Sequence, residues 1–160
     1  MEQCQSALLR VLMTNDGSMT VSLESLLQKK ITARVLSVSQ LEACDYFPTS
    51  TTLREVVLES EGKPYLHAIS HIKNEFYTEM GFGTDKPIGL IMREHNLAQY
   101  RDVYSIEKCE LSQEIAEKCG VNRTPTYSRK YFVHVNQKPM IHLIETALPE
   151  LLLAVGSEGL

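Results

Sequence analysis

Two β-hairpins with charged residues among aliphatic ones limit the folds open to this chain more than any other segment does. Residues 51–70, TTLREVVLESEGKPYLHAIS, predict two strands joined at residues 61–64, EGKP. Successive side chains of a strand point to opposite faces, so Arg54 shares a face with Val56. The opposite face carries Glu55, and glutamates predict the wetter side of a sheet. A guanidinium, which cannot be deprotonated in proteins, therefore stands on the predicted core side.

The second hairpin, predicted at about 127–135 and 139–147, repeats this pattern. Glu145 lies in line with the aliphatic residues of its strand, and Arg129 lies in line with those of the preceding strand. An unpaired buried charge is very costly, so each of these charges requires a partner. Two interpretations remain open. Glu145 forms a structural ion pair with Arg54 or Arg129, or the charges line a closed pocket for an anionic ligand.

Helical periodicity and capping residues predict helices between the strands. The predicted helices are about 2–13, a segment that begins after Ser18, a short one after Asp85-Lys86-Pro87, one from Ser112 to Gly120, and the start of the last ten residues, which end in a frayed tail. Further strands are predicted at 31–40 and 99–108, and residues 74–83 fit a helix or a loop. Strands joined by tight turns, with helices between them, favour a single α+β domain over residues 1–160, with helices on one face of an antiparallel sheet.

Composition excludes several classes of protein. The formal net charge of −4 argues against a nucleic-acid partner, which usually requires a basic stripe. No apolar run reaches the roughly 20 residues of a membrane span, and the N-terminus lacks the features of a signal peptide, so we expect no membrane partner and a cytoplasmic location. The four cysteines form no CxxC pair and are expected to be free thiols. His67 and His71 would lie about 13 Å apart on a strand, too far for one ion, so we expect no metal site.

Four motifs, taken in order over residues 10–150, resemble the chorismate pyruvate-lyase (4-hydroxybenzoate synthase) family, in particular its divergent archaeal and bacterial branch. They are LMTNDGSMTVSLESL, TLREVVLESEGKPYLHAIS, KPIGLIM and KPMIHLIETALPE. The resemblance implies an antiparallel sheet of about six strands, covered by helices, with a ligand enclosed beneath helical flaps. The effector-binding domains of some bacterial transcription regulators (the UTRA family) resemble the same fold.

The resemblance also implies an activity and the residues that carry it. The reaction is the conversion of chorismate, a small-molecule substrate, to 4-hydroxybenzoate and pyruvate, with no metal or organic cofactor. Arg54 matches the arginine that holds the benzoate carboxylate, and Glu145 matches the glutamate near the ring's 4-oxygen. Met19 and Ile88 match residues that line the pocket, and Arg129 falls in a basic segment that can also bind substrate. Glu145 could move a proton, although a concerted intramolecular hydrogen transfer fits equally well.

A binding protein is the alternative to an enzyme. The UTRA domains normally follow a DNA-binding winged helix, for which 160 residues leave no room. A free-standing module that binds an aromatic carboxylate without catalysis, or a lyase for another chorismate-like dicarboxylate, therefore stays open. Neither the oligomeric state nor the pathway that uses the product follows from the residues.

Overall fold

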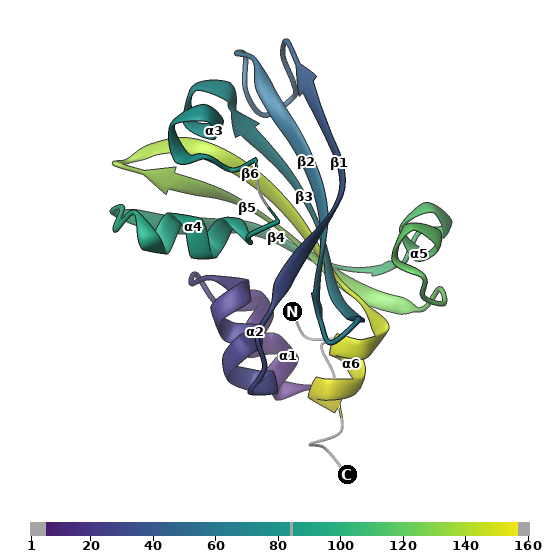
Figure 1. The fold of residues 1–160 in the computed structure, drawn as a ribbon. Helices are drawn as coiled ribbons and strands as arrows, with labels where there is room; N and C mark the ends of the chain where they lie inside the picture. Colours follow the sequence, from purple (N-terminus) through teal and green to yellow (C-terminus); the bar gives the residue numbers. More distant parts are fainter. Residues whose placement is uncertain (1–5, 84, 157–160) are drawn as a thin grey trace.

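A computed structural model describes residues 6–83 and 85–156, and its centre is one antiparallel sheet (Figure 1). The six strands are β1 (Thr32–Leu41), β2 (Thr51–Ser60), β3 (Lys63–Lys73), β4 (Gln99–Glu110), β5 (Pro125–Val135) and β6 (Lys138–Ala147). Their spatial order is β1-β2-β3-β6-β5-β4, so the closing strand β6 is inserted between β3 and β5. The α+β class and the antiparallel sheet predicted from the sequence are thus confirmed.

Both predicted hairpins end in turns with a left-handed backbone. Glu61 and Gly62 have φ angles of 50° and 76°, and Asn136 and Gln137 have φ angles of 48° and 67°. Two consecutive positive φ values define the type I′ turn, whose twist matches that of paired strands. Gln137 occupies a position where glycine is the favoured residue, because a Cβ atom is strained in this region.

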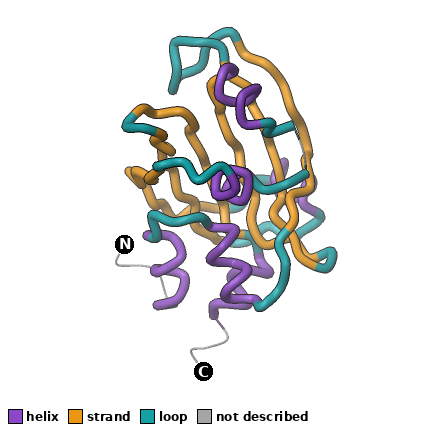
Figure 2. The backbone as a smooth tube through the Cα atoms, turned by 60° about the vertical axis from the view of Figure 1, so that its left-hand side comes forward, coloured by secondary structure: helices purple, strands orange, loops and turns teal. Residues whose placement is uncertain are grey.

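Five of the six helices in the described residues cover the sheet face that carries Arg54. In the described part of the chain the helices are α1 (Ala7–Thr14), α2 (Met19–Leu27), α3 (Asn74–Met80), α4 (Ile88–Glu94), α5 (Gln113–Cys119) and α6 (Pro149–Gly156). Apolar residues of α1, α2 and α6 pack in one cluster with Val56 and Leu58, and those of α3 and α4 pack in a second cluster with Tyr131 and Leu143. Figure 2 shows α1, α2 and α6 gathered at one end of the sheet, with α3 and α4 farther along it.

Helix α5 packs on the opposite face, which corrects the expectation that the glutamate side of β2 is the wetter one. Val57 is fully buried there against Leu111 and Ala116. Glu55 is only 8% exposed, because Lys118 from α5 and His67 from β3 both contact its carboxylate. The predicted cap of this helix is present, since the Ser112 hydroxyl accepts a hydrogen bond from the backbone N–H of Ile115.

The remaining expectations fall partly inside the described residues. Residues 74–80 are helical, which decides the ambiguous segment. Cys44, Cys109 and Cys119 are free thiols, while Cys4 lies outside the described residues. The start of the predicted helix at 2–5 and the predicted tail at 157–160 also lie outside them. None of the described helices is both long enough and apolar enough to cross a membrane.

Candidate active site

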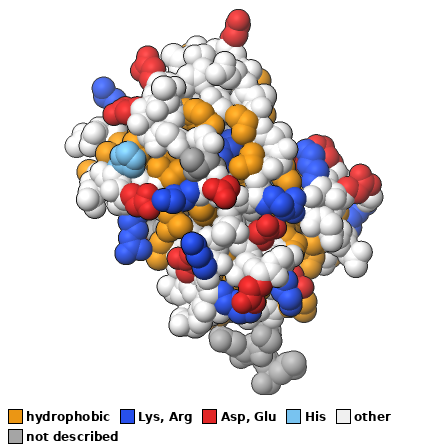
Figure 3. Space-filling model, in the orientation of Figure 1, with side chains coloured by type: hydrophobic (Ala, Val, Ile, Leu, Met, Phe, Trp, Pro, Cys, Tyr) orange, Lys and Arg blue, Asp and Glu red, His pale blue; other side chains and the backbone are white. Residues whose placement is uncertain are grey.

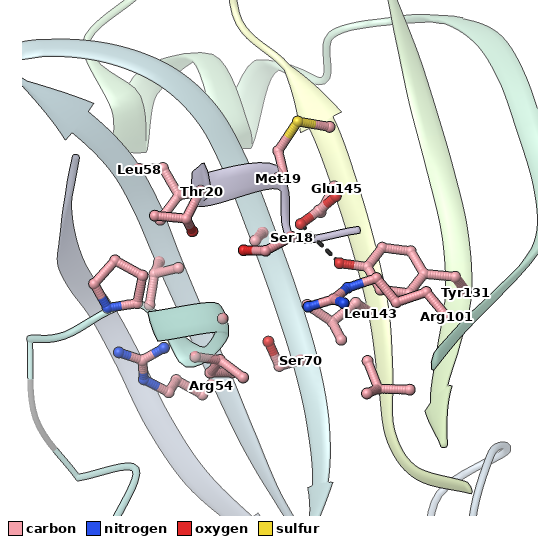
Figure 4. A pocket seen from close by; sticks show the side chains of 16 residues that line it. Ser18, Met19, Thr20, Arg54, Leu58, Ser70, Arg101, Tyr131, Leu143 and Glu145 are labelled. Atoms are coloured by element: carbon pink, nitrogen blue, oxygen red, sulfur yellow. Dashed lines mark hydrogen bonds between the residues drawn. The ribbon is translucent and has the colours of Figure 1, made fainter. Parts of the chain in front are cut away.

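A small cavity lies between the sheet and the first turns of α2 and α4 (Figure 4). Side chains of β2, β3, β5 and β6 form its floor, and residues 18–20 and 87–89 form its roof. Arg101 of β4 closes one side. The cavity has a volume of about 40 Å³, far below the roughly 300–1,000 Å³ of typical ligand pockets. The two helices are therefore closed down on the sheet.

Strand register explains why polar groups gather on this floor. Arg54 pairs with Ser70, Ser70 pairs with Leu143, and Leu143 pairs with Tyr131, so the four side chains form one row across four strands. Directly paired residues of a sheet project to the same face. Figure 4 shows the result, with Arg54 on the β2 side, Arg101 and Tyr131 on the other side, and Ser70 between them.

Arg54 is the cation at the β2 side of the cavity, and it is only 1% exposed. Its Nη2 atom donates a hydrogen bond to the backbone carbonyl of Lys86, 3.3 Å away, in the segment that leads into α4. Burial lowers the pKa of Arg54, and the nearby Tyr77 and Asp85 partly oppose this shift. Because arginine starts from so high a pKa, Arg54 keeps its charge and supplies a buried positive group.

Glu145 is the acidic group of the cavity, and two side chains hold it. The Nε atom of Arg129 donates to Oε2 at 2.7 Å. The Tyr131 hydroxyl donates to Oε1 at 2.9 Å, and Figure 4 shows this second bond as a dashed line. Burial, followed by the negative charge of Glu145, raises the pKa of Tyr131, so this phenol stays protonated and remains a donor. Both carboxylate oxygens of Glu145 thus have a hydrogen-bond partner that fixes their position.

Arg129 stands behind Glu145 and is not part of the cavity wall. It is fully buried, and its Nη1 atom donates to the backbone carbonyls of Leu12, at 3.2 Å, and Asn15, at 2.8 Å. These bonds tie the segment between α1 and α2 to the sheet. Strand parity predicted either a structural ion pair or a pocket. The ion pair is present as Arg129–Glu145, and Glu145 also lines the cavity.

The other residues expected from the sequence line the cavity. Met19, at 3% exposure, and Ile88, at 9%, cover it from α2 and α4. Arg54 and Glu145 lie on its floor, so four of the five expected residues come together in one place. Arg101 and Tyr131 also line it and were missed. In the sequence, Arg101 alternates with Val103, which indicates that both side chains point to the same face of the strand. The strand is otherwise largely polar, so its sequence does not show which face is buried.

The second charged cluster lies on the opposite face of the sheet. His67 Nε2 is 2.8 Å from Oε1 of Glu55, and Lys118 Nζ contacts both Glu55 oxygens at 3.0 and 3.1 Å. Burial raises the pKa of Glu55, but the hydrogen bonds from His67 and Lys118 outweigh it, and the pKa is lowered. No group of three or more histidine, cysteine, aspartate or glutamate side chains among residues 6–83 and 85–156 is arranged to hold a metal ion.

The structure is an α+β fold with a small closed cavity that contains an arginine and a glutamate. The chain belongs to the family described as "Chorismate pyruvate-lyase Rv2949c-like", whose model matches residues 13–154. A curated relative, "Putative lyase MJ0807" from Methanocaldococcus jannaschii, is 25% identical over 146 residues, which are 85% of this chain and 75% of the relative.

Solved structures share the fold at low sequence identity. The effector domain of PhnF from Mycobacterium smegmatis matches with a TM-score of 0.68 at 13% identity, over 84% of this chain and 90% of that domain. The "possible transcriptional regulator YydK" from Bacillus subtilis matches with a TM-score of 0.62 at 15% identity, over 76% of this chain. The chain spans 58% of that regulator. At these identities the likeness concerns the fold alone.

Proposed function

We propose that this protein eliminates pyruvate from chorismate to give 4-hydroxybenzoate. The observation that carries the proposal is a closed cavity with a buried arginine, Arg54, on one side and a fixed carboxylate, Glu145, on the other. Strand β3 separates β2 from β6, so the two backbones lie about 10 Å apart. A benzoate-sized ring can bridge that span once both side chains reach toward it. Membership of the chorismate pyruvate-lyase family supports the same assignment.

The reaction needs little from the protein beyond orientation and one proton transfer. The ring loses its C4 hydrogen as a proton, the bond between C3 and the ether oxygen breaks, and the electron pair leaves with the enolpyruvyl oxygen. A proton is then added at the methylene carbon to give pyruvate, so the atoms of chorismate are divided between the two products without water. Aromatisation supplies the driving force. The catalytic requirement is to hold the dianion in one reactive geometry.

Each group of the cavity has a role in this scheme. Arg54 binds the ring carboxylate through a charge-assisted hydrogen bond, and Met19 and Ile88 hold the ring from above. Glu145 lies at the reacting side, where it accepts or relays the C4 proton. Arg129 and Tyr131 position its carboxylate. The transfer can also pass directly from C4 to the enolpyruvyl methylene, in which case Glu145 orients the ring only.

The small volume of the cavity requires α2 and α4 to move. A space of about 40 Å³ cannot hold chorismate, so the first turns of these helices must separate from the sheet to admit it. Closure then excludes water from the reacting ring. This motion is the expected function of the helical flaps.

The test is a direct assay of the purified protein with chorismate. Absorbance of 4-hydroxybenzoate and coupled reduction of pyruvate should increase together, in equal amounts, and both should require the protein. Production of neither compound, at protein concentrations that bind 4-hydroxybenzoate, would reject the enzyme.

A non-catalytic domain that binds an aromatic carboxylate is the second candidate. It is favoured by the similarity in fold to the effector domain of PhnF, because the same fold can serve functions other than catalysis. In that case the protein binds 4-hydroxybenzoate and chorismate through Arg54, but chorismate is recovered unchanged. Calorimetry and the product assay on one preparation distinguish the two.

A further inference from the structure

The two edges of the sheet differ in how they are protected against pairing with another strand. An edge strand presents a row of backbone N–H and C=O groups that can pair with a further chain, and charged residues usually oppose this. Strand β4 has charged residues at five of its twelve positions. Strand β1, at the other edge, has one among its ten positions, which is Arg34. Residues 35–41 therefore form an edge without a charged side chain.

The second half of β1 is regular and exposed. A bulge interrupts the pairing of β1 with β2 just before Ser37, but residues 37–41 then pair with β2 one to one. The first four of these residues are exposed, and Val38 keeps 51% of its surface accessible. Among the described residues, the backbone bond that reaches β1 from outside the sheet lies near its start, where the N–H of Ala33 donates to the carbonyl of Asp85. The end of β1 is thus accessible to another strand.

Charged side chains are sparse around this edge. Figure 1 places the upper parts of β1 and β2 at the upper right of the molecule, and the same region in Figure 3 is mostly white and orange. Most of the blue and red side chains on that face lie in its middle and lower parts. The whole chain carries a net charge of −4, but salt screens such repulsion beyond about 8 Å under physiological conditions. Close approach of another chain to β1 is therefore not opposed by local charge.

We propose that β1 pairs with β1 of a second copy of this chain. A two-fold axis near Ser39 makes the two strands antiparallel and joins the two sheets into one. The uncharged segment is bounded by Arg34 at one end and by Glu42, which is exposed, at the other. Antiparallel pairing brings Arg34 of one copy beside Glu42 of the other at both ends, so opposite charges meet and specify the orientation. These residues lie outside the cavity, and the pairing does not depend on the proposed reaction.

The test is the mass of the full chain in solution at increasing concentration. A stable interface uses about 20–30 residues a side and this edge offers far fewer, so we expect a reversible dimer with a dissociation constant of about 1–100 µM. Sedimentation velocity across that range should show the monomer converting to a dimer. Hydrogen exchange at low and high concentration should show that the amides of residues 37–41 become protected in the dimer. A parent protein that stays monomeric throughout, or a dimer that leaves these amides unprotected, would overturn the proposal.

Variants locate the interface. Val38→Lys places two ammonium groups on one face of the paired strands and should raise the dissociation constant about tenfold or more. The matched control, Tyr100→Lys, introduces the same charge at a residue of β4 that is also 51% exposed, and it should leave the dissociation constant unchanged.

A charge exchange tests the orientation of the two strands. Arg34→Glu alone should weaken the dimer about two- to fivefold, the effect expected of exposed ion pairs, and adding Glu42→Arg should restore it. The melting temperature of each monomer verifies that the variants are folded. Unchanged association of Val38→Lys, an equal effect of Tyr100→Lys, or no recovery in the double variant would contradict antiparallel pairing through β1.

Discussion

Arg129 and Glu145 face each other across β5 and β6, and the Nε atom of the arginine donates a 2.7 Å hydrogen bond to Oε2 of the glutamate. The same arginine binds backbone carbonyls between α1 and α2. Arg129 thus orients the Glu145 carboxylate in the cavity. It also holds residues 12–15, which precede the roof residues 18–20, against the sheet. Changes to either residue of the pair should affect both the stability of the fold and the chemistry.

Glu145→Gln is expected to lower turnover and stability together. Loss of the carboxylate removes proton transfer, typically about 10²–10⁴-fold in rate, if Glu145 moves the C4 proton. It also leaves Arg129 as a buried cation without its counter-ion, at a cost of about 3–5 kcal/mol. Turnover of chorismate and the melting temperature are measured on the same variant. Tyr131→Phe is the comparison, since it removes one neutral donor from the same carboxylate, keeps the ion pair, and should cost about 1.5–3 kcal/mol. Parental turnover by folded Glu145→Gln would remove Glu145 from the mechanism.

Arg54→Ala should weaken binding of 4-hydroxybenzoate by roughly 10- to 150-fold, because a charge-assisted hydrogen bond is worth about 1.5–3 kcal/mol. Arg54→Lys should restore only part of the affinity, since an ammonium group lacks the planar fork of a guanidinium. Isothermal titration calorimetry on the three proteins measures this. Unchanged affinity in Arg54→Ala would show that the carboxylate binds elsewhere.

Gly89→Ala should disturb the contact between α2 and α4. The added Cβ atom would lie 2.2 Å from Ser18 Oγ and 3.2 Å from Ser18 Cβ. The Ser18 hydroxyl must turn away and the two helices must shift slightly, which we expect to cost about 1–3 kcal/mol of stability through overpacking. Denaturant unfolding measures the loss. Ser18→Gly in the Gly89→Ala variant should restore stability, because it removes the side chain that the new Cβ atom meets. The change from serine to glycine at an N-cap itself costs only a few tenths of a kcal/mol. Gly156→Ala, where a Cβ meets nothing within 4 Å, is the control. Equal stability of the two alanine variants would contradict the close contact.

His142 should make the protein less stable in mild acid. Burial lowers its pKa to about 4, with smaller effects from His71 and Lys130, whereas the unfolded chain titrates near 6.5. Between these values the unfolded state binds more protons, so the stability that neutral His142 contributes is present above about pH 6.5 and is lost as the pH falls toward 4. Tyr46 stacks on the ring at 3.5 Å, and the Tyr104 hydroxyl lies 2.7 Å from Nε2.

The measurement is the change in melting temperature between pH 7 and pH 4.5. His142→Gln should show a smaller change than the parent, because a glutamine does not titrate. His95→Gln, an exposed position after α4, should retain the full change. The assignment fails if both variants respond to pH as the parent does. Glu55 contributes in the same direction, since its lowered pKa also makes protonation in acid destabilising.

Much of the architecture follows from local features of the sequence. The two-residue period located the strands and placed Arg54, Arg129 and Glu145 on one face, and turn residues marked both hairpins. Ser112 and Gly120 marked the ends of α5, where Gly120 adopts a φ of 67°. These features involve residues that are neighbours along the chain, and their conformational preferences act before any tertiary contact forms.

The site itself depends on contacts between distant segments. No local feature of the sequence predicts that β6 lies between β3 and β5. This order places Glu145 between Ala68 and Arg129 on the neighbouring strands. Strand parity could not choose between Arg54 and Arg129 as the partner of Glu145, nor reveal that α5 buries Glu55. Pairing of strands and docking of helices are determined by packing over the whole molecule. A sequence therefore predicts which side chains share a face, while the folded structure alone determines which of them meet.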